Sequence, residues 1–422
     1  MMDLPDTTSS PKESHPYDSV PEYAGNPLIE ACGPIRSPAK VGRDLLVLPY
    51  TPEPGRKSPS HLRIHSMAGL SRLHVPSAIG LDLAMKIDVM MRQSYVLRSP
   101  NVVTTWAHMY GTHQNRTPPI CAAAIGGSGN GKTVAVMRSL SGYQQVVAHD
   151  SFPGLASRMR QLLWLAVSVP PSGKQKDFAE QWMRQMDYAL EENRFEEEFT
   201  KTPGPQLWAA CIKRARNHFL GMLFIDEMQN FFRLDSVRGR RSALAKGEIA
   251  DLRVAEDTAL RALVDLVNEG KFAVLVAGTP DGMAAFSKRF ASGQRLSIDG
   301  LLRFERIATA DDPFFAEYLF PALLKFSLAD SPPDAPDDLR KSLHAQTCGV
   351  PRILVACWKF MHDAMWKRGG DRLVEADIWR AMNTHLSPLQ APLEALRSND
   401  PRKLSLYEDL LPKEFNYFSH PS

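Results

Sequence analysis

The segment Gly126-Gly-Ser-Gly-Asn-Gly131-Lys132-Thr133 matches the pattern GxxxxGK[ST]. It follows a short apolar run at residues 120–125, typical of a buried strand, and it leads into residues 132–140, whose pattern predicts a helix. Glycines at such a junction let consecutive backbone N–H groups face one anion, and the helix N-terminus adds partial positive charge. The sequence therefore predicts a phosphate-binding loop made of Gly126, Gly127, Ser128, Gly129, Asn130, Gly131, Lys132 and Thr133.

A second motif lies about ninety residues further along the chain. Residues 222–225 form an apolar strand candidate, and Asp226 and Glu227 follow at its carboxyl end, where ligands bind in open α/β sheets. We expect Lys132 to reach the β- and γ-phosphates of ATP, and Thr133 and Asp226 to hold Mg²⁺. Glu227 would polarise the attacking water as a general base. The two motifs together predict an ATPase with Mg²⁺ as its cofactor.

Further strands and helices alternate around these motifs. Residues 272–277 form another strand candidate, and it ends near Thr279, whose hydroxyl could hold the lytic water or cap the turn before Pro280. Strands that alternate with helices predict an α/β fold in which helices cover both faces of a parallel sheet. The remaining candidates are a strand at 161–169 and helices at 74–98, 177–199, 208–219 and 260–267.

Composition limits the class of protein. The 422 residues exceed one compact unit, and 44% hydrophobic and 23% charged residues are typical of a soluble globular protein. The net charge of +3 is small, so any nucleic-acid surface must be a local patch. The apolar stretches are too short to span a membrane, and the start lacks the features of a secretory signal. The five cysteines form no CxxC pair, which argues against a zinc site and favours the cytoplasm. Because the apolar stretches are short, we expect no membrane partner.

The chain divides into four segments by composition. Residues 1–75 are expected to form an extended proline-rich arm, since eleven of the 32 prolines lie in residues 1–60; a flexible tail is the alternative. Residues 76–310 hold the alternating α/β pattern, and 311–386 show helical patterns typical of a small lid domain. Residues 387–422 form a tail that ends with several leucines.

The order of these features over about residues 95–385 resembles that of the AAA+ ATPases. More narrowly, three motifs resemble the TnsC and TniB transposition regulators: IDEMQNF at residues 225–231, VLVAGTP ending at Pro280, and CGVPRIL at residues 348–354. The arm sequence YAGNPLIEA at residues 23–31 is similar to the N-terminal region of some of these regulators. The resemblance covers the core and the lid well and the two termini poorly.

This resemblance implies roles for three more side chains. Thr279 matches the first sensor position, although many AAA+ members have asparagine there, and Arg352 matches the second sensor, an arginine that reaches the γ-phosphate from the lid. The segment LRFE contains Arg303, which resembles the arginine finger that a subunit offers to its neighbour. Arg295 and Arg306 are competitors for that role, and a surface ion pair is the alternative for each arginine.

The resemblance also implies assembly as rings or spirals around duplex DNA. Two basic segments could make sequence-independent phosphate contacts, and a solvated charged loop is the alternative for each. Because no helix-turn-helix or zinc finger is visible, we expect little base readout. The first segment flanks the helical insertion before the Asp-Glu strand and contains Lys174, Lys176, Lys201 and Thr202. The second contains Arg233, Arg238, Arg240, Arg241 and Lys246.

These observations predict an ATP-dependent regulator of transposition that forms a homo-oligomer, a ring or a helical filament, on double-stranded DNA in the bacterial cytoplasm. The arm would dock a target-selection protein of the TniQ or TnsD type, and the tail around residues 406–411 would dock the transposase. Two alternatives remain open. A replication initiator or helicase loader has the same ATP site but more often carries a winged helix after the lid. A nucleotide-gated scaffold would not bind DNA.

Overall fold

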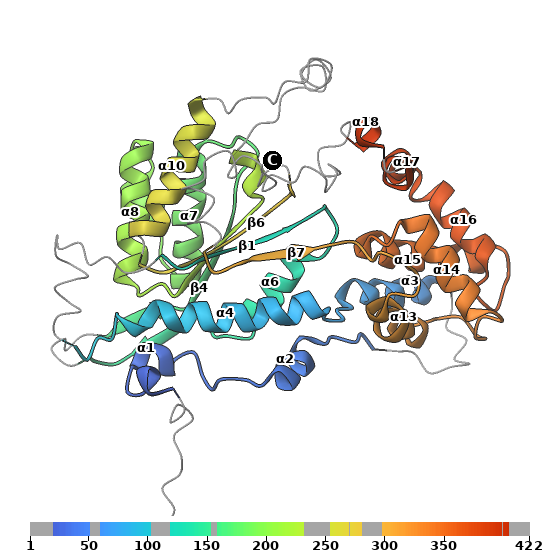
Figure 1. The fold of residues 1–422 in the computed structure, drawn as a ribbon, viewed down its shortest axis with the longest axis horizontal. Coiled ribbons are helices and arrows are strands. Elements are labelled where there is room, and N and C mark those ends of the chain that lie inside the picture. The colour runs from blue at the N-terminus through green and yellow to red at the C-terminus, as the bar shows by residue number, and fades with distance from the viewer. Residues whose placement is uncertain are drawn as a thin grey trace, which may run out of the picture.

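Five parallel strands form the central sheet, in the order β4-β5-β6-β1-β7 (Figure 1). The structure is a computed structural model that describes residues 20–50, 60–102, 119–152, 158–231, 254–269, 271–280, 298–398 and 400–404. The carboxyl ends of β1, β5 and β6 lie together at one edge of the sheet, because these strands are parallel and adjacent. The strands are β1 (Cys121–Gly126), β4 (Trp164–Ser168), β5 (Met222–Asp226), β6 (Ala273–Gly278) and β7 (Leu301–Phe304).

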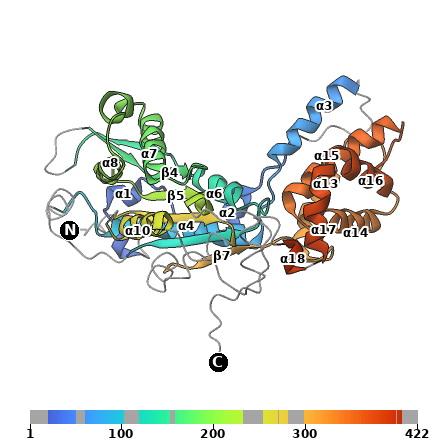
Figure 2. The same ribbon diagram turned by 90° about the horizontal axis from the view of Figure 1, so that it is seen from above.

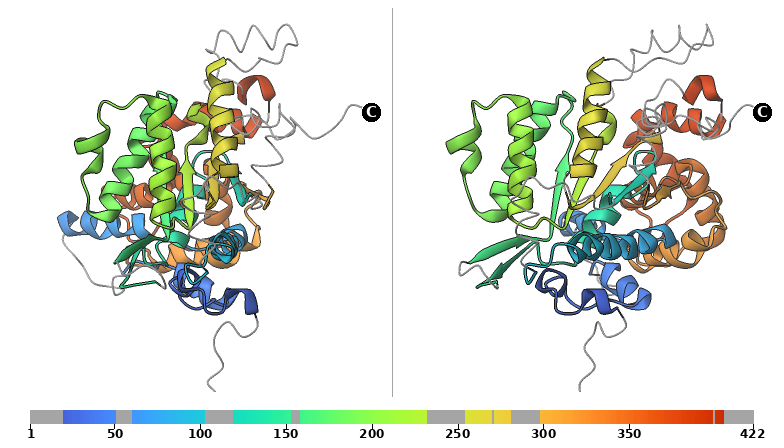
Figure 3. Two further views of the ribbon diagram at one scale, coloured as in Figure 1. Left: turned by 90° about the vertical axis from the view of Figure 1, so that its left-hand side faces the viewer. Right: turned by 60° about the vertical axis from the view of Figure 1, so that its left-hand side comes forward.

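Helices cover both faces of this sheet (Figure 3). Alternate residues of each strand enter two separate hydrophobic clusters, and every residue of β1, β5 and β6 is buried. The predicted α/β architecture is therefore confirmed. One cluster is closed by α7 (Gln175–Leu190), α8 (Gly204–Asn217) and α10 (Val254–Glu269); the other is closed by α4 (Ala78–Val96) and α6 (Lys132–Leu140).

The strand expected at residues 161–169 is wrong as a single element. The chain forms β3 (Met159–Leu162), which pairs with β2 (Val146–His149) in an antiparallel ribbon, and then enters the central sheet as β4. Leu163 stands between the two strands, and its N–H donates to the Gln145 carbonyl at 2.9 Å. The apolar run continues through this change of sheet because both strands are packed against the core, so hydrophobicity alone does not mark the break.

The helical insertion before β5 also has a break that the sequence did not indicate. The helix expected at residues 177–199 ends at Leu190, where Glu191 adopts a left-handed φ of +53°. A separate π-helical turn, η3 (Phe195–Phe199), follows. The buried guanidinium of Arg214 on α8 bonds Asp187 at 2.6 Å and Glu192 at 2.7 Å, so this ion-pair network fixes the corner between the two helices.

The lid is a group of helices at the other end of the molecule (Figure 2). Its core contains Trp358 and His362, both fully buried, and it agrees with the helical patterns expected after residue 311. It extends beyond the expected end at residue 386, because Leu393 is also buried in the lid core. The elements are η5 (Phe314–Leu319), α13 (Phe320–Lys325), α14 (Pro336–Thr347), α15 (Pro351–Lys367), α16 (Glu375–Thr384), η6 (Ser387–Leu389), α17 (Gln390–Ser398) and α18 (Pro401–Leu404).

The N-terminal arm is not extended where the structure describes it. Pro21, Pro27 and Pro38 stand at the first turns of short helices, where a missing N–H costs nothing. The caps Asn26 and Ser37 accept hydrogen bonds from the backbone. Leu28 and Ile29 are fully buried in the cluster of α4. These elements are η1 (Pro21–Tyr23), α1 (Pro27–Glu30) and α2 (Pro38–Leu45).

The chain then crosses from the core to the lid. An isolated bridge joins Val47 to His74, and α3 (Ser60–Ala68) and η2 (Gly69–Arg72) lie between these two residues in the sequence. Met67 and Leu70 are buried in the lid cluster, so the lid core contains residues from both ends of the chain. Within the described residues, no helix combines the length and the hydropathy needed to cross a membrane.

Candidate nucleotide-binding site

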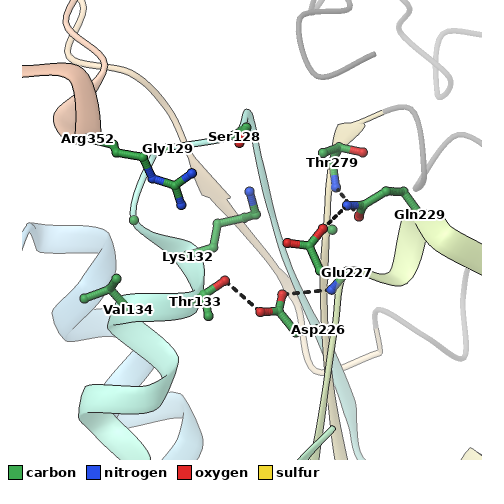
Figure 4. A pocket seen from close by; sticks show the side chains of 12 residues that line it. Ser128, Gly129, Lys132, Thr133, Val134, Asp226, Glu227, Gln229, Thr279 and Arg352 are labelled. Carbon is green, nitrogen blue, oxygen red and sulfur yellow. Dashed lines mark hydrogen bonds between the residues drawn. The ribbon is translucent and has the colours of Figure 1, made fainter. Parts of the chain in front are cut away.

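A cleft lies at the carboxyl ends of β1, β5 and β6, where the core faces the lid (Figure 4). The strand order places these three ends side by side, and α15 supplies a residue from the lid. The cleft therefore collects side chains that are far apart in the sequence. It is lined by Ser128, Gly129, Gly131, Lys132, Thr133, Val134, Asp226, Glu227, Gln229, Gly278, Thr279 and Arg352.

Glycines shape the loop between β1 and α6. Gly129 and Gly131 have φ values of +83° and +90°, a left-handed conformation that side chains disfavour. A Cβ atom on Gly126 would lie 2.1 Å from the Phe304 carbonyl oxygen, so only glycine fits there beside β7. The Asn130 side chain donates to the same carbonyl at 2.9 Å. Gly126, Gly127 and Asn130 do not line the cleft; Gly126 and Asn130 hold the loop against β7.

Two side chains at the start of α6 extend from the loop. The Lys132 ammonium donates to the carbonyls of Gly126 at 2.6 Å and Gly127 at 3.1 Å, so its charge lies within the loop. The Thr133 hydroxyl donates to Asp226 Oδ2 at 2.8 Å. The two motifs, 93 residues apart, are thus joined by a direct hydrogen bond.

The turn after β5 carries the second carboxylate. Asp226 is buried, and its Oδ1 accepts the Glu227 N–H at 2.9 Å. Glu227 has a left-handed φ of +53°, and its side chain is exposed to the cleft. The Gln229 amide donates to Glu227 Oε2 and accepts the Thr279 N–H at 3.3 Å (Figure 4). Gln229 therefore bridges the ends of β5 and β6.

The lid contributes Arg352, the second residue of α15. Its N–H donates to the Gly129 carbonyl at 3.2 Å, and a Cβ on Gly129 would lie 3.2 Å from the Arg352 Cβ. The lid thus packs directly on the phosphate-binding loop. The guanidinium is exposed and makes no hydrogen bond or ion pair with the described residues, so it is available to an anion in the cleft.

The residues of the cleft fit a nucleotide with Mg²⁺. The left-handed glycines and the N-terminus of α6 offer N–H donors to phosphate, and the cleft has a cation on each side, Lys132 and Arg352. The adjoining hydroxyl of Thr133 and carboxylate of Asp226 are the hard oxygen donors that Mg²⁺ takes beside phosphate oxygens. These donors already adjoin in the structure.

Comparison with known proteins agrees with this geometry. Residues 116–284 match the AAA domain family. The match begins before β1 and ends after Thr279, so the matched region includes the loop, the Asp-Glu turn and the polar end of β6. The parallel sheet with its helical lid is an AAA+ P-loop fold. No curated protein matches the chain.

Solved structures with an AAA+ fold are similar at low identity. The Aeropyrum pernix ORC1 protein in complex with DNA is 12% identical, with a TM-score of 0.44, covering 74% of this chain and 67% of that one. The Thermotoga maritima RuvB Holliday junction branch migration motor is 15% identical, with a TM-score of 0.34 and coverage of 63% and 61%. Drosophila ORC bound to DNA is 10% identical, with a TM-score of 0.42 and coverage of 96% and 82%.

Two of the arginine-finger candidates lie apart from the cleft. Arg303 is exposed on β7, at the edge of the sheet, and it does not line the cleft of its own protomer. Arg306 donates to the Cys348 carbonyl at 3.1 Å, so its guanidinium holds the lid. Arg295 lies outside the described residues. The assignment of Arg303 to a neighbour's site stays a prediction.

The predicted DNA contacts divide into two groups. The first lies where α7 and α8 begin: a Cβ on Gly204 would be 3.1 Å from the Lys176 Cβ, so the two helix N-termini adjoin. Lys174 and Lys201 are exposed there, and Lys176 pairs with Glu180 at 3.6 Å. Thr202 is half-buried in the turn before α8. The second group, with Arg233, Arg238, Arg240, Arg241 and Lys246, lies outside the described residues.

Three residues of the cleft were missed from the sequence. Val134 lines it with an exposed side chain, Gly278 lines it at the end of β6, and Gln229 bridges Glu227 and Thr279. The signal for Gln229 was present, since it stands two residues after Glu227 in the motif IDEMQNF. Its contact with β6 could not be read from the sequence, because it depends on which strand lies beside β5.

Proposed function

We propose that this protein binds and hydrolyses ATP with Mg²⁺ in the cleft, and that the nucleotide state controls its assembly on duplex DNA. The observation that carries the proposal is the convergence on one cleft of Lys132, Thr133, Asp226 and Glu227 from the core with Arg352 from the lid. The match of the central region to the AAA domain supports it. The finer role, regulation of transposition, rests on the motifs that resemble TnsC and TniB.

Each residue has a task set by its position. Lys132 leaves the loop carbonyls and binds the β- and γ-phosphates, while Arg352 contacts the γ-phosphate from the lid. Thr133 and Asp226 hold Mg²⁺, which offsets the negative charge of the phosphates. Glu227 accepts the proton of the water that attacks the γ-phosphorus. Because the backbone of Arg352 already contacts the loop, a bond from its guanidinium to the γ-phosphate ties the lid to the core through the nucleotide.

Assembly places Arg303 of one protomer at the cleft of the next. An exposed arginine on an edge strand suits this task, because a guanidinium from a neighbour stabilises charge that develops on the phosphates. Hydrolysis then releases the γ-phosphate, which joins the two protomers. The subunit interface and the ATP cycle are coupled in this way.

The contact with DNA is assigned to the paired N-termini of α7 and α8. Two helix N-termini with Lys174 and Lys201 beside them favour phosphate oxygens over base edges. Binding is therefore expected to be independent of sequence and to weaken steeply with salt.

Two partner proteins complete the proposed role. A target-selection protein of the TniQ or TnsD type docks on the N-terminal arm, and the transposase docks on the tail around residues 406–411, which lies outside the described residues. Pull-down of each partner with chains that lack residues 1–19 or 405–422 tests these contacts. Unchanged capture by a shortened chain would refute a contact made by the removed residues. Capture of a replicative helicase in place of a transposase would favour the initiator alternative.

The ATPase proposal is tested by phosphate release with purified protein. We expect turnover that requires Mg²⁺ and that stops when EDTA removes the metal. Light scattering or electron microscopy with a slowly hydrolysed analogue and duplex DNA should show multimers. Protein that stays monomeric with nucleotide and duplex both present would contradict the proposal.

The DNA contact is tested by titrating a random duplex at several salt concentrations. Replacing Lys174 and Lys201 by glutamine should weaken binding to all sequences alike and lower the slope of log K against log salt by about 0.9 for each lost contact. The matched control changes Lys213, further along α8, and Lys325 of the lid to glutamine, which should leave the slope unchanged. The absence of any gel shift, with or without nucleotide, would favour the scaffold alternative.

A further inference from the structure

Gln229 makes one contact as a donor and another as an acceptor. Its NH₂ group donates to the Glu227 carboxylate, and its carbonyl oxygen accepts the Thr279 N–H. A carboxylate can only accept and a backbone N–H can only donate, so the two ends of the amide are not interchangeable. The side chain is therefore fixed in one orientation between β5 and β6 (Figure 4).

The turn that carries Gln229 is itself firmly held. It is the short helix η4 (Met228–Phe231), and the Asn230 side chain donates to the Val169 carbonyl at 2.8 Å. The Phe231 ring packs against Phe178 of α7 with centroids 5.3 Å apart. A Cβ on Gly278 would lie 3.2 Å from the Gln229 side-chain oxygen, so a glycine at the end of β6 leaves room for the amide.

The Thr279 hydroxyl has no hydrogen-bond partner among the residues that the structure describes, although Thr279 is only 3% exposed. A buried hydroxyl without a partner costs about 1–3 kcal/mol, so such a group calls for a ligand. Thr279 lines the cleft together with Glu227 and Gln229. The Thr279 hydroxyl and the Glu227 Oε1 atom therefore lie on the two sides of the Gln229 amide, which contacts Glu227 through Oε2.

We propose that Gln229 is a positioning residue, which holds the Glu227 carboxylate beside the Thr279 hydroxyl so that the two orient one water. The inference rests on the proposed ATPase function and deepens it. The oxygen of this water bonds to the γ-phosphorus, the bond from that phosphorus to the β-γ bridging oxygen breaks, and the water proton passes to Glu227. Gln229 touches neither the phosphate nor the water, and acts through the angle at which Glu227 is held.

Two substitutions separate the contacts of the amide. Gln229→Ala removes both of them, whereas Gln229→Glu keeps an acceptor for the Thr279 N–H and loses the donor to Glu227. We expect both variants to lower kcat by about tenfold, which is a small part of the 10²–10⁴-fold effect of a general base. The KM and the equilibrium affinity for ATP should stay unchanged. Gln144→Ala, an exposed glutamine before β2, is the matched control and should behave as the wild type.

A nucleotide-free measurement distinguishes the two variants. Because Gln229 accepts the Thr279 N–H, hydrogen exchange of a peptide that covers residues 273–280 should be faster in Gln229→Ala and as slow as wild type in Gln229→Glu. If Gln229 merely shaped the turn, Gln229→Glu would keep both slow exchange and full kcat. That result would overturn the inference.

A double-mutant cycle with Glu227→Gln completes the test. When Glu227 is already replaced, Gln229→Ala should cause no further loss in single-turnover hydrolysis. Equal, independent losses in both backgrounds would overturn the inference. The proposed function fails separately: wild-type protein that binds no ATP, or binds it without turnover, refutes the ATPase, whereas active wild-type protein with fully active Gln229 variants refutes only the role of Gln229.

Discussion

The two walls of the cleft are built in different ways. On the core wall the polar side chains bond one another, as Thr133 does with Asp226 and Gln229 with Glu227. On the lid wall, Arg352 presents an exposed guanidinium that no described residue pairs. The core wall is thus arranged before a nucleotide arrives, whereas the lid wall gains its contact only when a phosphate is bound. Substitutions on the two walls should therefore affect different steps.

The largest effect is expected at the core wall, for Glu227→Gln. This change keeps the shape of the side chain and removes the proton acceptor, so kcat should fall by about 10²–10⁴-fold. ATP affinity should be retained, and the protein should accumulate in an assembled, ATP-bound state. Phosphate release and equilibrium binding of a fluorescent ATP analogue measure the two quantities. A variant with near wild-type turnover would remove Glu227 from the mechanism.

The next effect concerns binding by the core wall. Lys132→Ala removes a charged hydrogen-bond donor to phosphate, which is worth about 1.5–3 kcal/mol, so ATP affinity should fall about 10- to 100-fold. Titration calorimetry gives the affinity, and Lys325→Ala, an exposed lid lysine, is the control. Equal affinities for both variants would show that Lys132 does not contact the nucleotide.

The lid should be the acid-sensitive half of the molecule. Burial lowers the pKa of His362 from 6.5 to about 4, against a smaller raising effect of its bond to the Trp358 carbonyl. Below pH 6.5 the unfolded chain binds the proton more readily than the folded one, so stability is lost as the pH falls from 6.5 toward 4. At pH 5 this loss amounts to about 2 kcal/mol. Urea unfolding at pH 7 and pH 5 measures it, and His362→Gln should unfold with a weaker dependence on pH.

The smallest effect is expected at the lid wall. Arg352→Ala should lower ATP affinity by about tenfold. This is near the lower end of the free energies of hydrogen bonds to charged groups, because the guanidinium is solvated before binding. ADP affinity should change less, since ADP lacks the γ-phosphate. Arg380→Ala, another exposed lid arginine, is the control. An equal loss for ATP and ADP would show that Arg352 does not read the γ-phosphate.

The sequence predicted the core wall better than the surroundings of the cleft. The loop at 126–133 and the Asp226–Glu227 pair are local patterns, and the helix expected at 132–140 coincides with α6. Elements set by tertiary pairing were missed. Residues 302–305 were read only as a finger segment, although Leu301–Phe304 form the edge strand β7 beside β1. The contact of Gln229 with Thr279 likewise depends on the neighbour of β5, which no local pattern reveals.

The prolines near the N-terminus show a different limit of prediction from sequence. They were taken to exclude helices, but proline excludes only the interior of a helix and suits its first turn. The preference of proline for the first turn of a helix also accounts for the start of α18 at Pro401, and Leu404 at the end of this helix is buried. Hydrophobic residues between such prolines, as at Leu28 and Ile29, were the better guide to packing.

The docking of the N-terminal segment sets the boundaries for truncation. Leu28 and Ile29 fill the core beneath α4, and Met67 and Leu70 fill the lid, each side chain contributing about 1.5–3 kcal/mol when buried. A fragment that starts at Ala78 would lack these side chains and would expose hydrophobic surface in both the core and the lid. Failure of this fragment to capture a partner would indicate misfolding as much as a lost contact. Cutting after residue 19 spares every one of these packed side chains.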